Sequence, residues 1–425
     1  MHREQSLAAL AAFVLLAAPL AAADAEIVAA AHKLKGPALS AALVQNFDEK
    51  ALNEGSAFAQ DHGQFLFAVR SASEPSLQID DRPAGKMQRV KGSDLWTLET
   101  KLATGRSHAI EYSAGGKPIG RRLDIRAYTD LHYPRAGVAQ GKVSEKQVNT
   151  SKIYRGMVSD WWYYISPGVE PGKPAPLMIW QDGQGFSSRD SASRLFTVTE
   201  NLIADGKIPP MVHLMISPGM EGERRMRSIE YDTVNLDYTR FVLDEILPEL
   251  EKHQKIRTDA YSRASAGQSS GGICAFISAW LAPNEISRVL SRIGSYTSIA
   301  WRSGDENGED LLESGHSLPF RVRKGDKRNI RVWMEDGSND LENNHGSWPL
   351  QNVQLANSLK MRDYDFTFHF GNAQHSSANG DSMLPQALTW LWRDYDPSKT
   401  SQEFTMDPTE GEKPYFRIER LNRNH

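Results

Sequence analysis

One short stretch constrains the fold more than any other: Gly267-Gln268-Ser269-Ser270-Gly271, within the segment 261–272 (YSRASAGQSSGG). The pattern G-x-S-x-G is typical of a sharp turn from a strand into a helix, with the serine at its apex. Glycines are needed two residues to either side, because a Cβ there would collide with the neighbouring strand or helix. An ordinary Gly/Ser-rich loop is the alternative. The apolar run Ile273–Leu281, which has the length of a helix, favours the turn.

The N-terminus has the pattern of an export signal. Met1–Gln5 carries a histidine and an arginine, Leu7–Leu20 is apolar, and Ala21–Ala23 offers small residues for cleavage before Asp24. An anchor helix is the alternative, but the stretch is short and ends in small residues. We therefore expect a signal peptide over residues 1–23 and a secreted or periplasmic protein.

Composition narrows the class of protein. The chain has 425 residues, too many for one small domain, and a net charge of −4, which does not indicate nucleic acid or an anionic membrane as a partner. The single cysteine, Cys274, excludes an intramolecular disulfide, and we expect it to be buried and not a second nucleophile. No later run is apolar and long enough to span a bilayer.

Residues 63–136 alternate short β-rich runs with turn residues, which predicts a small β-sandwich. Residues 24–62 before it are alanine-rich, and we expect them to be helical or loosely ordered. Residues 137–150 are polar and are interpreted as a linker. The β-rich runs are Gln64–Arg70, Ser76–Asp80, Leu95–Leu102 and His108–Ser113.

Residues 151–395 alternate strand-like and helical segments, which predicts an α/β domain with a mostly parallel sheet covered on both faces. In such sheets the site forms at the carboxyl ends of the strands. Residues 396–425 are interpreted as a C-terminal tail. The strand-like segments are Asp160–Ser166, Leu177–Gln181, Met211–Ser217, Ile330–Glu335 and Phe366–Phe370; the helical ones are Arg194–Asp205 and Asp237–His253.

A serine hydroxyl becomes a good nucleophile only when a base takes its proton. Of the 12 histidines, His375 is the best candidate, because it lies in a loop that follows the last predicted strand. An exposed loop histidine is the alternative interpretation. His345 and His369 are second choices, and His369 would lie within the strand.

A carboxylate must orient the histidine. We select Asp340, at the end of the turn Gly337–Asp340 after the strand Arg331–Met334, with Asp336 and Glu342 as alternatives. A solvated turn carboxylate is the competing interpretation for each. The chain order serine, acid, histidine is the one found in α/β-hydrolases.

An oxyanion hole needs two backbone amides. One should belong to Ser270, directly after the nucleophile, and the other to Gln184 in the glycine-containing loop that follows Leu177–Gln181. Asp182, Arg227 and Trp348 are candidate substrate-binding residues. Arg227 forms a cluster with Arg224 and Arg225 that could be an ordinary surface cluster, and core packing is the alternative for Trp348. No spacing of ligands indicates a metal site, and no motif indicates a cofactor.

Several segments resemble the enterochelin esterase and esterase D-like branch of the α/β-hydrolases. The likeness covers roughly Ser151–Asp394. It also extends to residues 63–136, where FLFAVR, Asp94–Trp96 and HAIEYSAGG resemble the immunoglobulin-like domain ahead of such enzymes. The segments are Leu177–Gly185, Ile208–Gly219, Arg227–Asp232, Phe241–Leu250, Gly267–Gly272, Trp333–Asn352 and Gly371–Ser376.

The resemblance implies acyl transfer through an acyl-serine, with Ser269, Asp340 and His375 as the triad. We expect an exported serine carboxylic ester hydrolase whose substrate is a small-molecule or carbohydrate ester, such as a feruloyl or acetyl sugar ester or a siderophore-type ester. An acyltransferase of the same fold, or a non-catalytic glycan- or siderophore-binding protein, is the alternative. The N-terminal sandwich could cap the site or bind glycan, and its core-like aromatic pattern favours the cap.

Overall fold

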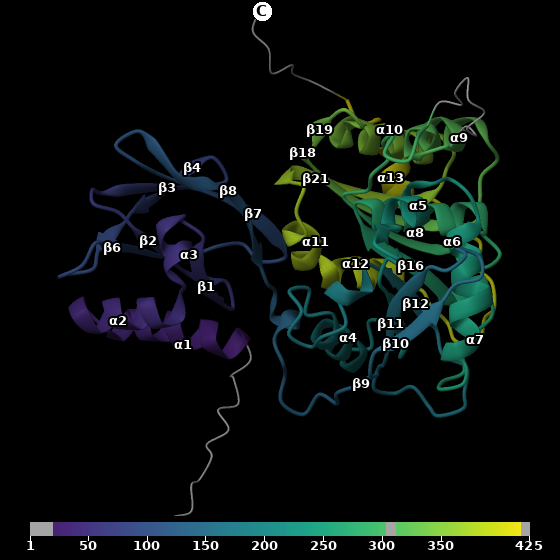
Figure 1. Ribbon diagram of the computed structural model, residues 1–425, viewed down its shortest axis with the longest axis horizontal. Coiled ribbons are helices and arrows are strands. Elements are labelled where there is room, and N and C mark those ends of the chain that lie inside the picture. Colours follow the sequence, from purple (N-terminus) through teal and green to yellow (C-terminus); the bar gives the residue numbers. More distant parts are fainter. Residues whose placement is uncertain (1–19, 303–311, 418–425) are drawn as a thin grey trace, which may run out of the picture.

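The computed structural model describes residues 20–302 and 312–417. Two units lie next to each other along the long axis of the molecule, a smaller β-rich unit near the N-terminus and a larger α/β unit (Figure 1). The expected signal peptide lies outside the described residues except for its last few positions, which begin helix α1.

The N-terminal unit contains two four-stranded antiparallel sheets. One has the order β1-β2-β6-β5, the other β4-β3-β7-β8, and three helices precede them in the chain. The elements are α1 (Leu20–Lys33), α2 (Gly36–Asn46), α3 (Glu49–Asn53), β1 (Ala57–Asp61), β2 (Gln64–Arg70), β3 (Pro75–Ile79), β4 (Arg82–Lys86), β5 (Gln88–Arg89), β6 (Leu95–Lys101), β7 (Arg106–Ala114) and β8 (Lys117–Ala127).

Strand β2 has an almost continuous apolar sequence because both of its faces are buried. Side chains alternate between the two faces of a strand, so Phe65 and Phe67 pack between the two sheets while Leu66 and Ala68 pack against the helices. The predicted strands coincide with β2, β3, β6 and β7 to within two residues at each end. Strand β1 was not predicted; it pairs with β2 along its whole length, so the β-rich unit begins before residue 63.

The predicted linker 137–150 is only partly a linker. Strands β9 (Lys142–Val143) and β10 (Gln147–Thr150) both pair with β11 (Val158–Ile165) of the large sheet. The sequence of this segment is polar because the two short strands lie at the edge of the large sheet and are exposed to solvent. Even Val148 is 60% exposed. The predicted tail also differs: Phe404 is buried and Phe416 packs against Phe368 of the large sheet.

The large sheet has the order β15-β14-β11-β13-β12-β16-β17-β18-β21. Neighbours from β13 to β21 are parallel, whereas β11 is antiparallel to β13. Its remaining strands are β12 (Leu177–Gln181), β13 (Val212–Ile216), β14 (Met220–Glu221), β15 (Arg224–Arg225), β16 (Arg263–Gln268), β17 (Arg288–Arg292), β18 (Arg331–Asn339) and β21 (Asp365–Gln374); a separate hairpin joins β19 (Glu342–Asn343) to β20 (Gly346–Ser347).

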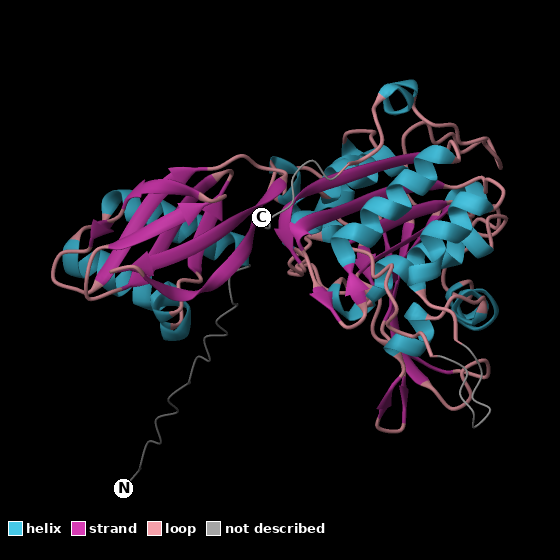
Figure 2. Ribbon diagram, turned by 90° about the horizontal axis from the view of Figure 1, so that it is seen from above, coloured by secondary structure: helices cyan, strands magenta, loops and turns pink. Residues whose placement is uncertain are grey.

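Helices cover both faces of this sheet (Figures 1 and 2). Leu177 and Ile179 of β12 point to one helical layer, and Met178 and Trp180 point to the other. One layer contains α4 (Leu195–Ala204) and α12 (Leu384–Leu391). The other contains α5 (Arg227–Asp232), α6 (Asp237–Arg240), a π-helical segment (Phe241–Ile246), α7 (Leu247–Leu250), α8 (Ser270–Leu281), α9 (Leu318–Lys324) and α10 (Trp348–Met361).

Two short helices complete the larger unit, α11 (Ala378–Ser382) and α13 (Pro408–Glu412). Within the described residues, no helix combines the length and the apolar character needed to cross a membrane. The result is a mixed α/β fold with a mostly parallel sheet, as the alternation of strands and helices predicted.

The buried histidine His213 of β13 gives a testable pH dependence. The Trp180 indole N–H donates to its Nδ1 at 2.9 Å, so Nε2 carries the hydrogen and faces Thr199 Oγ1 at 3.1 Å. Burial lowers the pKa of His213 to about 3. The unfolded chain takes up this proton near pH 6.5 while the folded protein does not, so acid favours unfolding by about 1.4 kcal/mol per pH unit in that window.

We therefore expect His213→Gln to lose less stability than the wild type between pH 7 and pH 5. Urea unfolding followed by tryptophan fluorescence at the two pH values measures both losses. Equal losses in the two proteins would contradict a neutral His213.

Candidate active site

The serine turn has the strained geometry that the sequence pattern predicts. Ser269 lies between the end of β16 and the start of α8 with φ 56° and ψ −123°, a region that non-glycine residues rarely occupy. Its amide donates to the carbonyl of Arg292 at 2.9 Å, and its carbonyl accepts from the amides of Gly272 and Ser295 at 2.9 and 3.0 Å. These hydrogen bonds hold the strained residue in place.

The two glycines of the motif leave no room for a Cβ atom. A Cβ on Gly267 would collide with the backbone of Gly271. A Cβ on Gly271 would lie 3.0 Å from Asp182 Oδ2 and 3.1 Å from the Cβ of Gln181. Contacts this short are rare for a Cβ in folded proteins, so a side chain at position 271 would push the loop after β12 away from the turn, whereas one at position 267 would clash within the turn itself.

Ser269, His375 and Asp340 form one chain of hydrogen bonds. His375 Nε2 lies 2.8 Å from Ser269 Oγ, and His375 Nδ1 lies 2.5 Å from Asp340 Oδ1. The carboxylate fixes the hydrogen on Nδ1, which leaves Nε2 free to accept the serine proton. The Asp340 side chain is fully buried, whereas that of His375 is 21% exposed. The arrangement can generate a nucleophilic serine at the protein surface.

The register of the large sheet explains why the acid meets the histidine. β18 and β21 are parallel neighbours, and their last paired residues are Asn339 and Gln374. Asp340 and His375 are the next residue on each strand, so they leave the sheet together. Both strands run about four residues beyond their predicted ends. The predicted acid turn is therefore the irregular end of β18, where Gly337 lies against the backbone of Ala373.

The alternative acids and bases do not join this chain in the described residues. Asp336 is buried and accepts from the Gly337 amide at 2.8 Å, and Glu342 is exposed on β19. His369 stacks on Trp333 with ring centroids 4.2 Å apart, inside the strand as expected. The His345 carbonyl accepts from the Ser298 amide, whereas the described hydrogen bonds of Ser269 Oγ go to His375 and Ser295.

Sequence reasoning missed Ser295. Its Oγ lies 3.1 Å from Ser269 Oγ and accepts from the Trp348 indole N–H at 3.1 Å. Since the indole occupies an acceptor position, the Ser295 hydroxyl can donate to Ser269 Oγ. Ser295 follows β17, so a correct prediction of that strand would have pointed to it. Trp348 itself is buried and packs edge-on against the His375 ring, so it lies behind the three hydrogen-bonded side chains and not on an open pocket wall.

The loop after β12 is built for a close approach to the turn. Asp182 has the left-handed conformation (φ 56°, ψ 41°) and starts a short 3-10 helix, Gly183–Gly185, that contains Gln184. The Arg227 guanidinium binds both Asp182 carboxylate oxygens at 2.8 Å. Arg224 and Arg225 lie on the exposed strand β15 instead. Of the three arginines, only Arg227 therefore reaches this loop.

A cavity of about 350 Å³ lies beside the loop and the turn. Polar side chains from several elements converge on it, including two carboxyl groups and one guanidinium group. It is lined by Asp182, Gln184, Gly185, Phe186, Ala192, Ser193, Arg227, Gln268, Ser377 and Asp381.

Buried carboxyl groups surround this region. Burial raises the pKa of Glu230 and of Asp232 to about 7, although the Arg227 charge opposes the shift in both. Asp336 and Asp340 each have a buried Oδ2 without a hydrogen-bond partner. Burial and the neighbouring Asp340 side chain raise the pKa of Asp336. No group of three or more potential metal ligands occurs in the part of the chain that the structure describes.

Comparisons with known proteins agree with this geometry. The family model described as "Putative esterase" matches residues 162–391. An Iron(III) enterobactin esterase of Dickeya dadantii is 32% identical over 249 residues, which are 57% of this chain and 53% of that protein. An endo-1,4-beta-xylanase/feruloyl esterase of Xylanibacter ruminicola is 34% identical over 100 residues, 23% of this chain and 14% of that protein. The match thus spans about half of the first relative and a small part of the second.

A likeness of fold extends further along the chain. The crystal structure of the enterobactin esterase from Shigella flexneri in the presence of enterobactin superposes with a TM-score of 0.54 at 18% identity. The superposition covers 79% of this chain and 95% of that one. At this level of identity it shows a shared fold.

The buried pair Asp336 and Asp340 gives a second pH prediction. Burial and the adjacent Asp340 carboxylate raise the pKa of Asp336 far above its usual range. The unfolded chain releases this proton above about pH 4 while the folded protein keeps it, so rising pH favours unfolding. Asparagine has no such proton, so Asp336→Asn should gain stability relative to the wild type by about 1.4 kcal/mol per pH unit between pH 5 and 8. Urea unfolding at both pH values measures it, and a difference independent of pH would contradict a protonated Asp336.

Proposed function

The chain belongs to the putative esterase family, and from this premise we propose that it hydrolyses carboxylic esters through an acyl-serine intermediate. The observation that carries the proposal is the hydrogen-bond chain from Ser269 through His375 to Asp340, at the apex of a strained turn. A turn without function has no reason to hold a serine in a costly backbone conformation.

Each residue of the chain has a role in the proposed reaction. Ser269 Oγ attacks the ester carbonyl carbon while His375 Nε2 takes its proton, and Asp340 stabilises the imidazolium that forms. The amides of Ser270 and Gln184 stabilise the negative oxygen of the tetrahedral intermediate, each by about 3 kcal/mol. His375 then protonates the leaving alcohol, and water releases the acid by the same steps in reverse order. No cofactor takes part.

We propose a small-molecule or carbohydrate ester as the substrate, either a feruloyl or acetyl sugar ester or a siderophore-type ester. By their names, the relatives described above are an enterobactin esterase and a feruloyl esterase. The hydroxyl, carboxylate and guanidinium groups that line the cavity suit a hydroxylated substrate. The Arg227 guanidinium already pairs with the Asp182 carboxylate. We therefore assign Arg227 to positioning the loop that contains Gln184 and not to binding an anionic substrate.

We further propose that the N-terminal unit is an immunoglobulin-like sandwich that caps the site, in a protein exported by a signal over residues 1–23. Two observations support the cap. The aromatic side chains of the sandwich, including Phe65, Phe67 and Tyr112, are buried in its own core and are not exposed for stacking on a glycan. The edge strand β8 makes hydrogen bonds and an ion pair with α11 and the histidine loop. The esterase domain then extends from β9 to the region of α13, further at both ends than residues 151–395.

The nucleophile assignment is tested by Ser269→Ala. We expect kcat for p-nitrophenyl acetate to fall on the order of 10⁴-fold or more, because the residues of a triad act as a unit. The matched control is Ser278→Ala, a buried serine further along α8, which should stay within about twofold of the wild type. Substantial activity in Ser269→Ala would show that another residue attacks the ester.

The acid assignment is tested by comparing two isosteric substitutions. Asp340→Asn should lower kcat by roughly 10⁴-fold with little change in KM, because it disturbs the histidine tautomer and not substrate binding. Asp336→Asn should have a far smaller effect, since Asp336 does not contact His375 and an amide can still donate to Asp340. A larger loss in Asp336→Asn would move the acid role to Asp336.

A further inference from the structure

We propose that Asp124, a residue of the N-terminal unit, is a positioning residue for His375. This inference rests on the proposed function, since it concerns the base of that reaction. Asp124 lies on β8, some 250 residues before the histidine in the sequence, yet its carboxylate binds both chain neighbours of His375.

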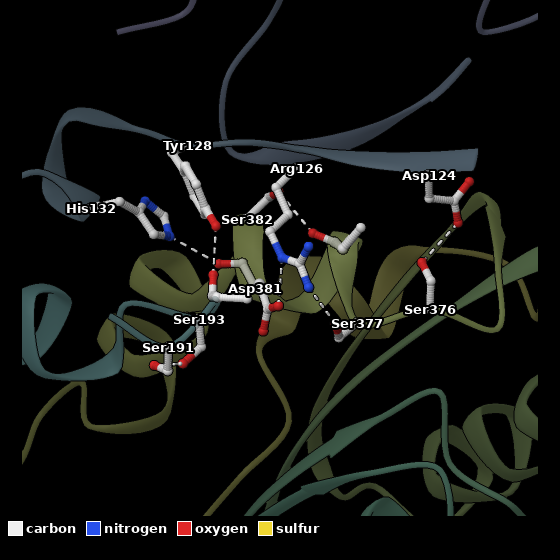
Figure 3. Close-up of polar contacts among 12 residues, drawn as sticks. Asp124, Arg126, Tyr128, His132, Ser191, Ser193, Ser376, Ser377, Asp381 and Ser382 are labelled. Carbon is white, nitrogen blue, oxygen red and sulfur yellow. Dashed lines mark hydrogen bonds and ion pairs between the residues drawn. The ribbon is translucent and has the colours of Figure 1, made fainter. Parts of the chain in front are cut away.

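The contacts bracket the histidine. Asp124 Oδ2 accepts from the backbone amide of Gln374 at 2.7 Å and from the hydroxyl of Ser376 at 3.0 Å. Figure 3 shows the Asp124 carboxylate opposite Ser376, at the end of the row of contacts between β8 and α11. Gln374 and Ser376 are the residues directly before and after His375. A single oxygen of the N-terminal unit therefore holds the histidine loop at two points.

The alternation of β8 explains why Asp124 points outward. Ile125 and Ala127 pack in the core between the two sheets of the N-terminal unit. Side chains on a strand point alternately to opposite faces, so Asp124 and Arg126 project from the other face. β8 is also the edge strand of its sheet. Its free backbone edge binds Ser382 through the Ala127 amide, and its polar face contacts Gln374 and Asp381.

A second group of contacts fixes β8 in this position. Arg126 donates to Asp381 at 2.8 Å and to Ser377 Oγ at 2.7 Å, and the Ala127 amide donates to Ser382 Oγ at 3.1 Å (Figure 3). The side chain of Asp381 is 4% exposed and also pairs with Arg292 of β17 at 2.7 Å. Burial opposes ionisation, but the two arginines prevail and lower the pKa of Asp381. This anchor makes the Asp124 contact part of a built interface.

The histidine loop has few other restraints. Its pairing with β18 ends at Gln374, and the next regular element, α11, starts at Ala378. Between these points the His375 side chain is held by its bonds to Asp340 and Ser269 and by the edge of the Trp348 ring, and its backbone depends on what holds its neighbours. The Asp124 carboxylate supplies two such bonds. Both bonds of Asp124 Oδ2 go to the residues on either side of His375, so we assign Asp124 a role that acts through His375.

The test uses the full chain and four single variants. Asp124→Ala should lower kcat for p-nitrophenyl acetate on the order of 10- to 100-fold with KM within about twofold, because misplacing a catalytic group by about 1 Å has an effect of this size. Ser376→Ala removes one of the two bonds and should lower kcat less. Asp124→Asn keeps an oxygen that can accept both bonds and should restore most of the activity. The control is Asp94→Ala, which removes the Arg70 pair at another edge of the same unit and should keep the wild-type kcat.

Hydrogen exchange provides a readout that does not depend on activity. The Gln374 amide hydrogen should exchange faster in Asp124→Ala than in the wild type. In Asp94→Ala it should exchange at the wild-type rate. If Asp124→Ala does not fold, Asp124→Asn and Ser376→Ala carry the test through their kcat values. In that case Ser376→Ala with wild-type kcat would overturn the proposal.

Three outcomes would overturn the inference: wild-type kcat in Asp124→Ala, an equal loss in Asp94→Ala, or a loss confined to KM. These outcomes are separate from failure of the proposed function, which would appear as activity retained in Ser269→Ala. Inactive Ser269→Ala and His375→Ala together with fully active Asp124→Ala would leave the esterase proposal standing and refute only the role of Asp124.

Discussion

The positive φ of Ser269 is the constraint on which the site depends. A serine can hold that conformation only if the chain on both sides can approach closely, which is why Gly267 and Gly271 lie two residues away. The carbonyl of Arg292, at the end of the neighbouring strand β17, receives the serine amide. The sheet, helix α8 and the loop after β12 therefore meet at this turn. The Ser269 hydroxyl lies between the end of β16 and the start of α8.

Much of this arrangement could be predicted, because it rests on local patterns. The glycine spacing predicted the turn, and apolar runs such as Leu177–Gln181 predicted the central strands. Strand β17 was missed because three of its five residues are Arg288, Ser291 and Arg292, which read as surface residues. They are buried nevertheless: Arg288 donates to two backbone carbonyls and lies over aromatic rings. Missing that strand also hid Ser295, which follows it.

Other features depend on partners that are distant in the sequence. Nothing local to 331–339 shows that the strand continues past Glu335, because the extra residues are stabilised by pairing with β21. The role of the edge strand β8 is similar. This strand was not predicted, although Arg122-Leu-Asp-Ile-Arg126 alternates polar and apolar residues, and only the fold shows that α11 contacts its polar face.

The two units share a buried group of charges, which joins them structurally. Asp381 is almost completely buried, and a buried carboxylate with one cation removed costs about 3–5 kcal/mol. Its two cations come from different units, Arg126 from β8 and Arg292 from β17. The α/β unit by itself would hold this carboxylate with only one of its partners, six residues after His375. An interface that merely tethered a binding module could be polar and solvated. This interface places its most deeply buried charge beside the loop of His375, where, if the proposed reaction takes place, a small displacement would alter the reaction geometry.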